Sequence, residues 1–181
     1  MKTCIINFSG RKNGNCHDIA KLIERAKSAG NEVRLYEFCD INVSPCGKCN
    51  YECFDKNTNC PYIADGIYSM YDSICSAELA YYVVPNYCDY PCANFFIFNE
   101  RSQCYFQNRY DLLGRYLQVS KKFIVVSNTE QENFNLAFKY HLTEDMDVDA
   151  LFLLPKAFDK DSIKGNLVDS AEVKGVVRKF I

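Results

Sequence analysis

The chain has 181 residues, of which 48% are hydrophobic, and a formal net charge of −2. This length fits a single domain that buries roughly 70% of the surface of its unfolded chain. A charge this small gives no electrostatic basis for binding nucleic acid or an anionic membrane. No apolar run approaches the roughly 20 residues that a transmembrane helix needs, so we expect neither a nucleic-acid nor a membrane partner.

The chain contains eleven cysteines, which is the unusual feature of its composition. Its N-terminus has one Lys and a short apolar run that Asn7 interrupts, which is typical of a first strand and not of a secretion signal. An odd number of cysteines without such a signal favours reduced thiols or metal ligands over a disulfide framework. We therefore expect a cytoplasmic protein.

Apolar runs of strand length alternate along the chain with amphipathic segments of helical period. The expected strands cover residues 3–8, 33–38, 79–84, 122–127 and 151–154. The expected helices cover residues 15–29, 65–75, 131–142 and 170–180, and a long aromatic segment at 92–119 is compatible with an interrupted helix. Residues 39–62 are expected to form a cysteine-rich loop, and residues 155–168 a surface loop.

Strands that alternate with helices predict a parallel sheet with right-handed crossovers. We expect one α/β domain over residues 1–181, with a doubly wound five-stranded sheet in the order 2-1-3-4-5. In such sheets, ligands bind beyond the carboxyl ends of the strands, where the strand order reverses between strands one and three. The loops 9–16, 85–92 and 127–131 leave the sheet at that edge, and so does the cysteine-rich loop 39–62.

The first of these loops is rich in groups that bind anions. Its glycines flank a cationic pair, Arg11 and Lys12, and the next helix points its unpaired N–H groups and about half a positive charge of dipole back at the loop. The loop therefore predicts a cradle for a cofactor phosphate. The alternative is an ordinary strand-to-helix turn with a solvated cationic pair, and the loop has neither a Rossmann nor a Walker motif. The candidate phosphate ligands are Ser9, Arg11, Asn13, Gly14, Asn15 and Cys16.

The segment from Ser9 to Cys16 resembles the Ser-x-Arg-x-x-Gly-Asn-Thr phosphate loop of the NAD(P)H-dependent FMN reductases and the iron-sulfur flavoproteins. Cys16 stands where these families usually have Thr or Ser. The resemblance implies a three-layer, flavodoxin-like fold and noncovalently bound FMN. It is strongest over residues 1–101.

The second loop extends this resemblance. Its prolines and Tyr87 resemble the Pro-x-Tyr … Pro-Ala loop that holds the isoalloxazine ring, which implies that Pro85, Asn86, Tyr87 and Cys88 flank the ring. Tyr87 and Tyr90 are suited to stack on a flat ring. The alternative is a tight polar turn with surface tyrosines. The third loop, residues 127–130, matches less well, because it lacks the glycines that bring the backbone close to a flavin.

Of the five cysteines in the cysteine-rich loop, four are closely spaced, at Cys46, Cys49, Cys53 and Cys60. Four thiolates can hold either an iron-sulfur cluster or a tetrahedral zinc ion. The compact spacing resembles the cysteine motif of the iron-sulfur flavoproteins, which implies a 4Fe-4S cluster. Zinc remains an alternative, as do free thiols or reversible disulfides.

We therefore interpret the chain as an FMN-binding oxidoreductase that transfers electrons or reduces a small acceptor. If the cysteine-rich loop holds a cluster, we expect it to pass electrons to the flavin. The resemblance implies NAD(P)H or a ferredoxin-like carrier as the electron donor. Part of an aromatic stripe at residues 95–110 is expected to form a subunit interface, in a homodimer or homotetramer. The alternative is a non-enzymatic flavodoxin-like module that uses its cysteines for zinc binding or redox sensing.

Overall fold

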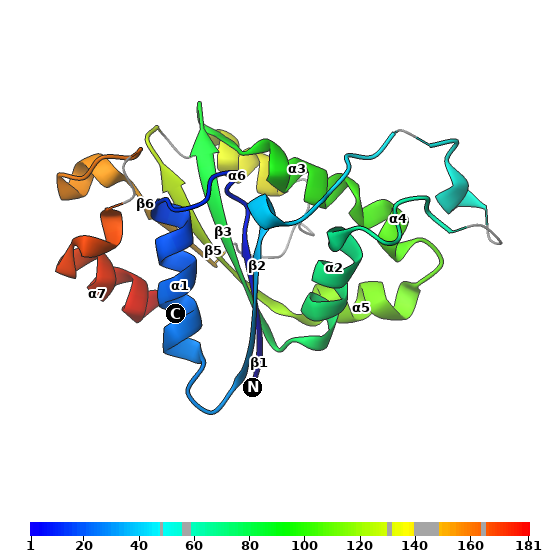
Figure 1. Ribbon diagram of the computed structural model, residues 1–181, viewed down its shortest axis with the longest axis horizontal. Helices are drawn as coiled ribbons and strands as arrows, with labels where there is room; N and C mark the ends of the chain where they lie inside the picture. Colours follow the sequence, from blue (N-terminus) through cyan, green and yellow to red (C-terminus); the bar gives the residue numbers. More distant parts are fainter. Residues whose placement is uncertain (48, 56–58, 130–131, 140–148, 164–165) are drawn as a thin grey trace.

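The structure is a computed structural model that describes residues 1–47, 49–55, 59–129, 132–139, 149–163 and 166–181 (Figure 1). The predicted end of the fourth helix, at 140–142, and the side chain of Glu130 lie outside the described residues. Among the described helices, none has the length and hydropathy needed to cross a bilayer.

A central sheet runs through the molecule, with its strands in the order β2-β1-β3-β5-β6. All four pairings along this path are parallel, so the predicted order 2-1-3-4-5 of five parallel strands is confirmed. One further strand, the two-residue β4, pairs antiparallel with β3 and was not predicted. The strands are β1 (Lys2–Asn7), β2 (Glu32–Glu37), β3 (Leu79–Tyr87), β4 (Tyr90–Pro91), β5 (Ser120–Ser127) and β6 (Asp149–Leu153).

Helices cover both faces of the sheet, which gives the three layers (Figure 1). Side chains alternate along each strand, so Ile5 and Tyr81 pack with α1 and α7 on one face, while Ile6 and Tyr82 pack with α2, α3 and α4 on the other. β3 is buried along nearly its whole length, as its continuous apolar sequence predicts. The helices are α1 (Asn15–Lys27), α2 (Gly66–Ser76), α3 (Ala93–Glu100), α4 (Ser102–Phe106), α5 (Tyr110–Gln118), α6 (Glu132–Lys139) and α7 (Ala171–Phe180).

The predicted loop at 85–91 is instead a β-hairpin, because β3 continues to Tyr87 and turns back into β4. Pro85 is tolerated in a central strand because β1 has already ended: its last pairing with β3 is at Val83. The two residues of the turn, Cys88 and Asp89, have φ values of 50° and 66°. This left-handed backbone is typical of a two-residue hairpin turn, and it is strained at a cysteine.

The aromatic segment at 92–119 forms three helices, which confirms its predicted interruption. Most of its predicted stripe lies in the core, where the ring of Tyr71 stacks on Phe98 at 4.3 Å and on Tyr105 at 4.9 Å between centroids. Only Phe96 and Tyr110 of the stripe are exposed. Burial therefore explains most of the stripe that the sequence analysis assigned in part to an interface.

Candidate functional site

A cavity of about 380 Å³ lies beyond the carboxyl ends of β1, β3 and β5, where the predicted cofactor site is expected. It brings together eight of the ten residues predicted to hold FMN, from the first loop and from the hairpin. Val126 and Asn128 of the β5 end, and Ser162 and Ile163 from the segment after β6, complete its wall. The eight predicted residues are Ser9, Arg11, Gly14, Asn15, Cys16, Pro85, Asn86 and Tyr87.

The N-terminus of α1 forms the floor of the anion cradle. Gly14 is the N-cap residue of this helix, and no side chain caps its first N–H groups. A Cβ atom placed on Gly14 would meet no other atom within 4 Å, so open space adjoins the helix end. The unpaired N–H groups and the helix dipole therefore face a space suited to an anion.

The cationic pair of the first loop is divided between two roles. Arg11 lines the cavity together with Tyr87, so the first loop and the hairpin face each other across it. Lys12 instead forms an ion pair with Asp40. Asn13 does not line the cavity. Its φ of 58° shapes the turn between the cationic pair and α1. Arg11 is therefore the side chain of the pair that is placed to bind a phosphate.

A chain of hydrogen bonds holds Ser9 in place. The Ser9 N–H donates to Asn7 Oδ1 at 3.0 Å, and Asn7 Nδ2 donates to Glu37 Oε2 at 2.6 Å. The other oxygen of Glu37 lies 2.9 Å from Nδ1 of His17, in the first turn of α1. Ser9 Oγ accepts a bond from the Arg11 N–H at 3.1 Å. Three elements, β1, β2 and α1, thus hold the first loop in one conformation.

The Asn15 side chain makes contacts that the sequence analysis did not predict. It is buried, donates to the carbonyl oxygens of Asp161 and Ser162 and accepts from the Leu167 N–H at 2.9 Å. The Asn15 amide therefore holds the segment after β6 against α1, at the wall of the same cavity. These bonds also place Ser162 and Ile163 in the cavity wall. The sequence analysis assigned both residues to a surface loop at 155–168 and did not predict their part in the site.

Cys16 lines the cavity but is only 5% exposed. Burial raises the pKa of its thiol far above its ordinary value, and the nearby Cys92 raises it further. The thiol is therefore protonated at neutral pH, so it brings no negative charge to the anion cradle. As an S–H group it replaces the hydroxyl of the family motif only as a weak donor.

The hairpin forms the opposite wall. Tyr87 lines the cavity and is 48% exposed, and Tyr90 lies opposite it in the β3–β4 pairing. Burial raises the pKa of the Tyr87 phenol, although Arg11 opposes this, so the phenol is neutral at neutral pH. Cys88 at the tip is exposed and does not line the cavity. Its predicted contact with the ring is thus absent from this cavity wall.

The third loop is hydrogen-bonded to the hairpin. Asn86 Nδ2 donates to Ser127 Oγ at 2.9 Å, and the Asp89 N–H donates to Thr129 Oγ1 at 2.9 Å. Asp89 Oδ2 also accepts from the Asn133 N–H, near the start of α6. These bonds give the loop a fixed position without the glycines of the family pattern, and they leave Asn128 in the cavity wall.

The four cysteines predicted to bind a metal do not form a metal-holding group among the described residues. Among the residues that the structure describes, no group of three or more His, Cys, Asp or Glu side chains is placed to hold a metal ion. Cys46 is exposed, and its N–H donates to Glu100 Oε1 at 2.7 Å. Cys53 and Cys60 line a second, smaller cavity together with Cys104. The ligand set that the cysteine spacing predicted is therefore not formed among the described residues.

Comparisons with known proteins agree with the sheet topology. No protein-family model matches the chain, and no curated protein matches it. Among solved structures, Smu.1420 from Streptococcus mutans is 14% identical with a TM-score of 0.64, over 99% of this chain and 100% of that one. The Trp repressor binding protein from Bacillus subtilis is 14% identical with a TM-score of 0.63, over 99% of both chains.

A third solved structure carries a functional description. FerB from Paracoccus denitrificans, described as a flavoenzyme NAD(P)H:(acceptor) oxidoreductase, is 15% identical with a TM-score of 0.51, over 99% of this chain and 95% of that one. At such low identity these likenesses establish the fold and not the activity. Together with the strand order, they show that the chain has the doubly wound, flavodoxin-like fold.

Proposed function

We propose that the chain binds FMN in the 380 Å³ cavity and is an NAD(P)H-dependent oxidoreductase that reduces a small acceptor. The observation that carries the proposal is the meeting, in one cavity, of the uncapped N-terminus of α1, Arg11 and the Tyr87 hairpin. The volume lies within the range of roughly 300–1,000 Å³ that small-molecule sites have. Its position at the reversal of strand order is where this topology binds ligands.

The phosphate end of the site is the cradle at α1. The first N–H groups of the helix donate to the phosphate oxygens, and the Arg11 guanidinium neutralises their charge. Ser9, whose N–H is held by Asn7, contributes its hydroxyl group at the loop. The buried thiol of Cys16 stays neutral beside them. The chemistry of this donor set fits a phosphate monoester.

The ring end of the site lies toward the hairpin. Tyr87 offers an aromatic face at the rim, and Val126 and Ile163 supply apolar walls. Asn128 supplies a polar group for the edge of the ring. A bound flavin supplies the hydride or electron transfer, while these side chains orient it and keep one face open to donor and acceptor. FerB, whose description names NAD(P)H and a flavoenzyme, supports a nicotinamide as the donor.

An iron-sulfur cluster forms no part of this proposal. Cys46, Cys49, Cys53 and Cys60 do not form a metal-holding group among the described residues, so we route no electron transfer through them. The same cysteines give no support to a zinc site.

The experiment is gel filtration of the purified protein after incubation with FMN, followed by anaerobic addition of NADPH or NADH to the flavin-containing fraction. We expect flavin absorbance to elute with the protein and to bleach on addition of one of the nicotinamides. Flavin that elutes only at its own small-molecule volume would refute FMN binding. Bound flavin that neither nicotinamide bleaches would refute the proposed donor and leave a ferredoxin-like carrier as the alternative.

A further inference from the structure

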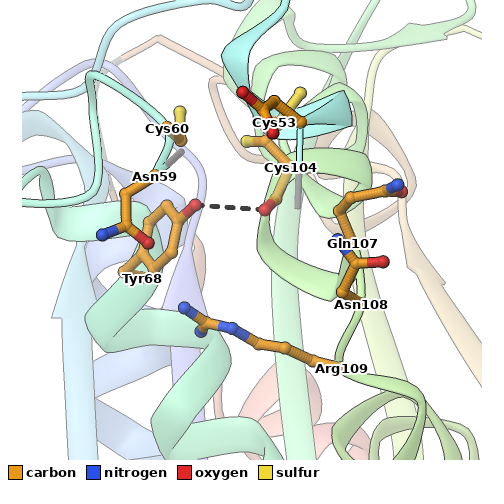
Figure 2. A pocket seen from close by; sticks show the side chains of 9 residues that line it. Cys53, Asn59, Cys60, Tyr68, Cys104, Gln107, Asn108 and Arg109 are labelled. Carbon is orange, nitrogen blue, oxygen red and sulfur yellow. Dashed lines mark hydrogen bonds between the residues drawn. The ribbon is translucent and has the colours of Figure 1, made fainter. Parts of the chain in front are cut away.

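The second cavity, of about 180 Å³, gathers three thiols at the base of the cysteine-rich loop (Figure 2). Cys53 and Cys60 come from the loop and Cys104 from α4, and their side chains converge at one end of the cavity. The rest of the wall is polar and comes mainly from Asn59 and from the turn at 107–109. The cavity is separate from the proposed flavin site and shares no lining residue with it.

Two of these thiols are buried. Cys60 and Cys104 are each 7% exposed, and both line the same cavity. The Tyr68 hydroxyl donates to the Cys104 carbonyl oxygen at 3.1 Å, which holds this part of α4 against α2 (Figure 2). Cys53 is more exposed than either. Cys60 and Cys104 are therefore the two buried thiols that face this cavity.

Arg101 fixes the geometry of this pair. Its guanidinium is fully buried, and Nε donates to Cys104 Sγ at 3.2 Å. The same group donates to the Ser44 carbonyl at 2.6 Å and the Tyr62 carbonyl at 3.2 Å, on either side of Cys60 along the loop. One side chain thus holds both the Cys104 sulfur and the loop segment that carries Cys60.

We propose that Cys60 and Cys104 form a reversible disulfide by exchange with a small aliphatic disulfide that enters this cavity. The Cys104 sulfur, which Arg101 Nε contacts at 3.2 Å, attacks the small disulfide after losing its proton and releases one thiolate. The Cys60 sulfur then attacks the mixed disulfide and releases the second. The two protein thiols lose two electrons and two protons, and the small disulfide gains them as two thiol molecules.

The reversible bond adds a covalent link between the cysteine-rich loop and α4. Without it, the loop is held to the helix layer by the Arg101 contacts and by the bond from the Cys46 N–H to Glu100. The bond would close the chain between positions 60 and 104. The cavity therefore serves as a redox-sensitive attachment point of the loop, independent of whether flavin binds.

The test is to incubate the reduced, full-length protein with bis(2-hydroxyethyl) disulfide, then alkylate it under denaturing conditions and count free thiols by mass. Exposed cysteines such as Cys46 and Cys88 can form mixed disulfides that add the mass of the reagent, so an internal bond is counted as thiols lost without added mass. We expect two of the eleven thiols to be lost in this way and to return after dithiothreitol. Peptide mapping without reduction is expected to recover a peptide containing Cys60 joined to one containing Cys104. Eleven free thiols after incubation, or a bond that joins Cys53 to either partner, would overturn the proposal.

Alanine variants separate the pair from its neighbours. Cys60→Ala and Cys104→Ala are each expected to abolish the internal bond, whereas Cys53→Ala and Cys75→Ala should still lose two thiols. Cys75 is a matched control because it is partly buried near the same helices but does not line the cavity. An internal bond that persists in Cys60→Ala or Cys104→Ala would contradict the pairing. Peptide mapping of the unmodified chain decides the question even where a variant fails to fold.

Discussion

Asn15 and Leu167 are 152 residues apart in the sequence, yet the Leu167 N–H donates to Asn15 Oδ1 at 2.9 Å. Asn15 lies in the first turn of α1, at the proposed phosphate cradle, and Leu167 is fully buried beyond it. The bond therefore joins the start of the cofactor site to the C-terminal part of the chain. It also explains how Ser162 and Ile163 reach the cavity wall.

The Asn15→Ala variant is expected to lower the free energy of unfolding by about 2 kcal/mol, because it leaves the buried Leu167 N–H and two carbonyl oxygens without their partner. Urea denaturation followed by circular dichroism measures this loss. Asn31→Ala is the matched control, since its side chain also makes several backbone bonds but is more exposed. A loss no larger than that of Asn31→Ala would contradict this role of the Asn15 side chain.

Glu37→Ala is expected to weaken FMN binding roughly tenfold, which corresponds to about 1.4 kcal/mol. The change removes the acceptor of the Asn7 and His17 side chains, so Asn7 no longer holds the Ser9 N–H in place. Glu37→Gln keeps oxygen and nitrogen at the same positions and should bind FMN nearly as well as the unmodified chain. Fluorescence titration measures both, and equal affinity of Glu37→Ala and the unmodified chain would refute the positioning role.

Arg101→Met is expected to lower the free energy of unfolding by about 3–5 kcal/mol, because it leaves the carboxylate of Asp65 largely buried without its ion-pair partner at 2.5 Å. The double variant Arg101→Met/Asp65→Asn should recover part of this loss, since it removes the unpaired charge. Chemical denaturation of both variants measures the difference. A single variant that loses less than about 1 kcal/mol would show that this pair does not hold the loop.

The stability of the reduced protein is expected to fall as the pH rises above 9. Burial raises the pKa of Cys4 to about 12 and those of Cys92 and Cys104 to about 11, and it raises the pKa of Cys16 further. Unfolded thiols lose their protons near the ordinary value of 9.0, so above that pH the folded state holds more protons and becomes less stable. Each such thiol contributes at most about 1.4 kcal/mol per pH unit.

Lys121 has the opposite effect on this pH profile. Burial lowers its pKa from 10.5 to about 8, so between these values the unfolded state holds more protons and stability rises with pH. The stability gained from Lys121 offsets the stability lost from about one thiol. The four buried thiols together lose more than Lys121 gains. Urea denaturation at pH 8, 9 and 10 in the presence of a reductant measures the net effect. Unchanged stability over this range would contradict the burial of the thiols.

The strand order could be predicted from the sequence because the apolar runs are long and alternate regularly with helical segments. The β3–β4 hairpin could not, because Pro85 and Pro91 are typical of loops. Pro85 can lie inside a strand only because β1 ends before it and needs no hydrogen bond from it. That depends on how two distant segments pair. The loop that contains Arg11 was identified from local sequence because its groups lie within a few residues of one another.

The remaining parts of the site depend on contacts that no local pattern encodes. Asn15 belongs to the family motif, yet its amide is used by the segment after β6, which has no motif of its own. Cys60 likewise lies in a cysteine-rich pattern typical of a metal site, but it lines a cavity with Cys104, which lies outside that pattern. In both cases the sequence identified the residue, and its partner was set by the packing of distant elements.

The central claim is that Arg11 binds the phosphate of FMN in the cavity at α1, and a comparison of neighbouring cations tests it most directly. Fluorescence titration of FMN against Arg11→Ala and Lys12→Ala provides the measurement. Loss of a charge-assisted bond predicts an affinity roughly thirtyfold lower for Arg11→Ala, or about 2 kcal/mol. Lys12→Ala should bind as the unmodified chain does, because Lys12 pairs with Asp40 and does not line the cavity. Equal affinities for FMN in both variants, or no binding to the unmodified chain, would contradict the account.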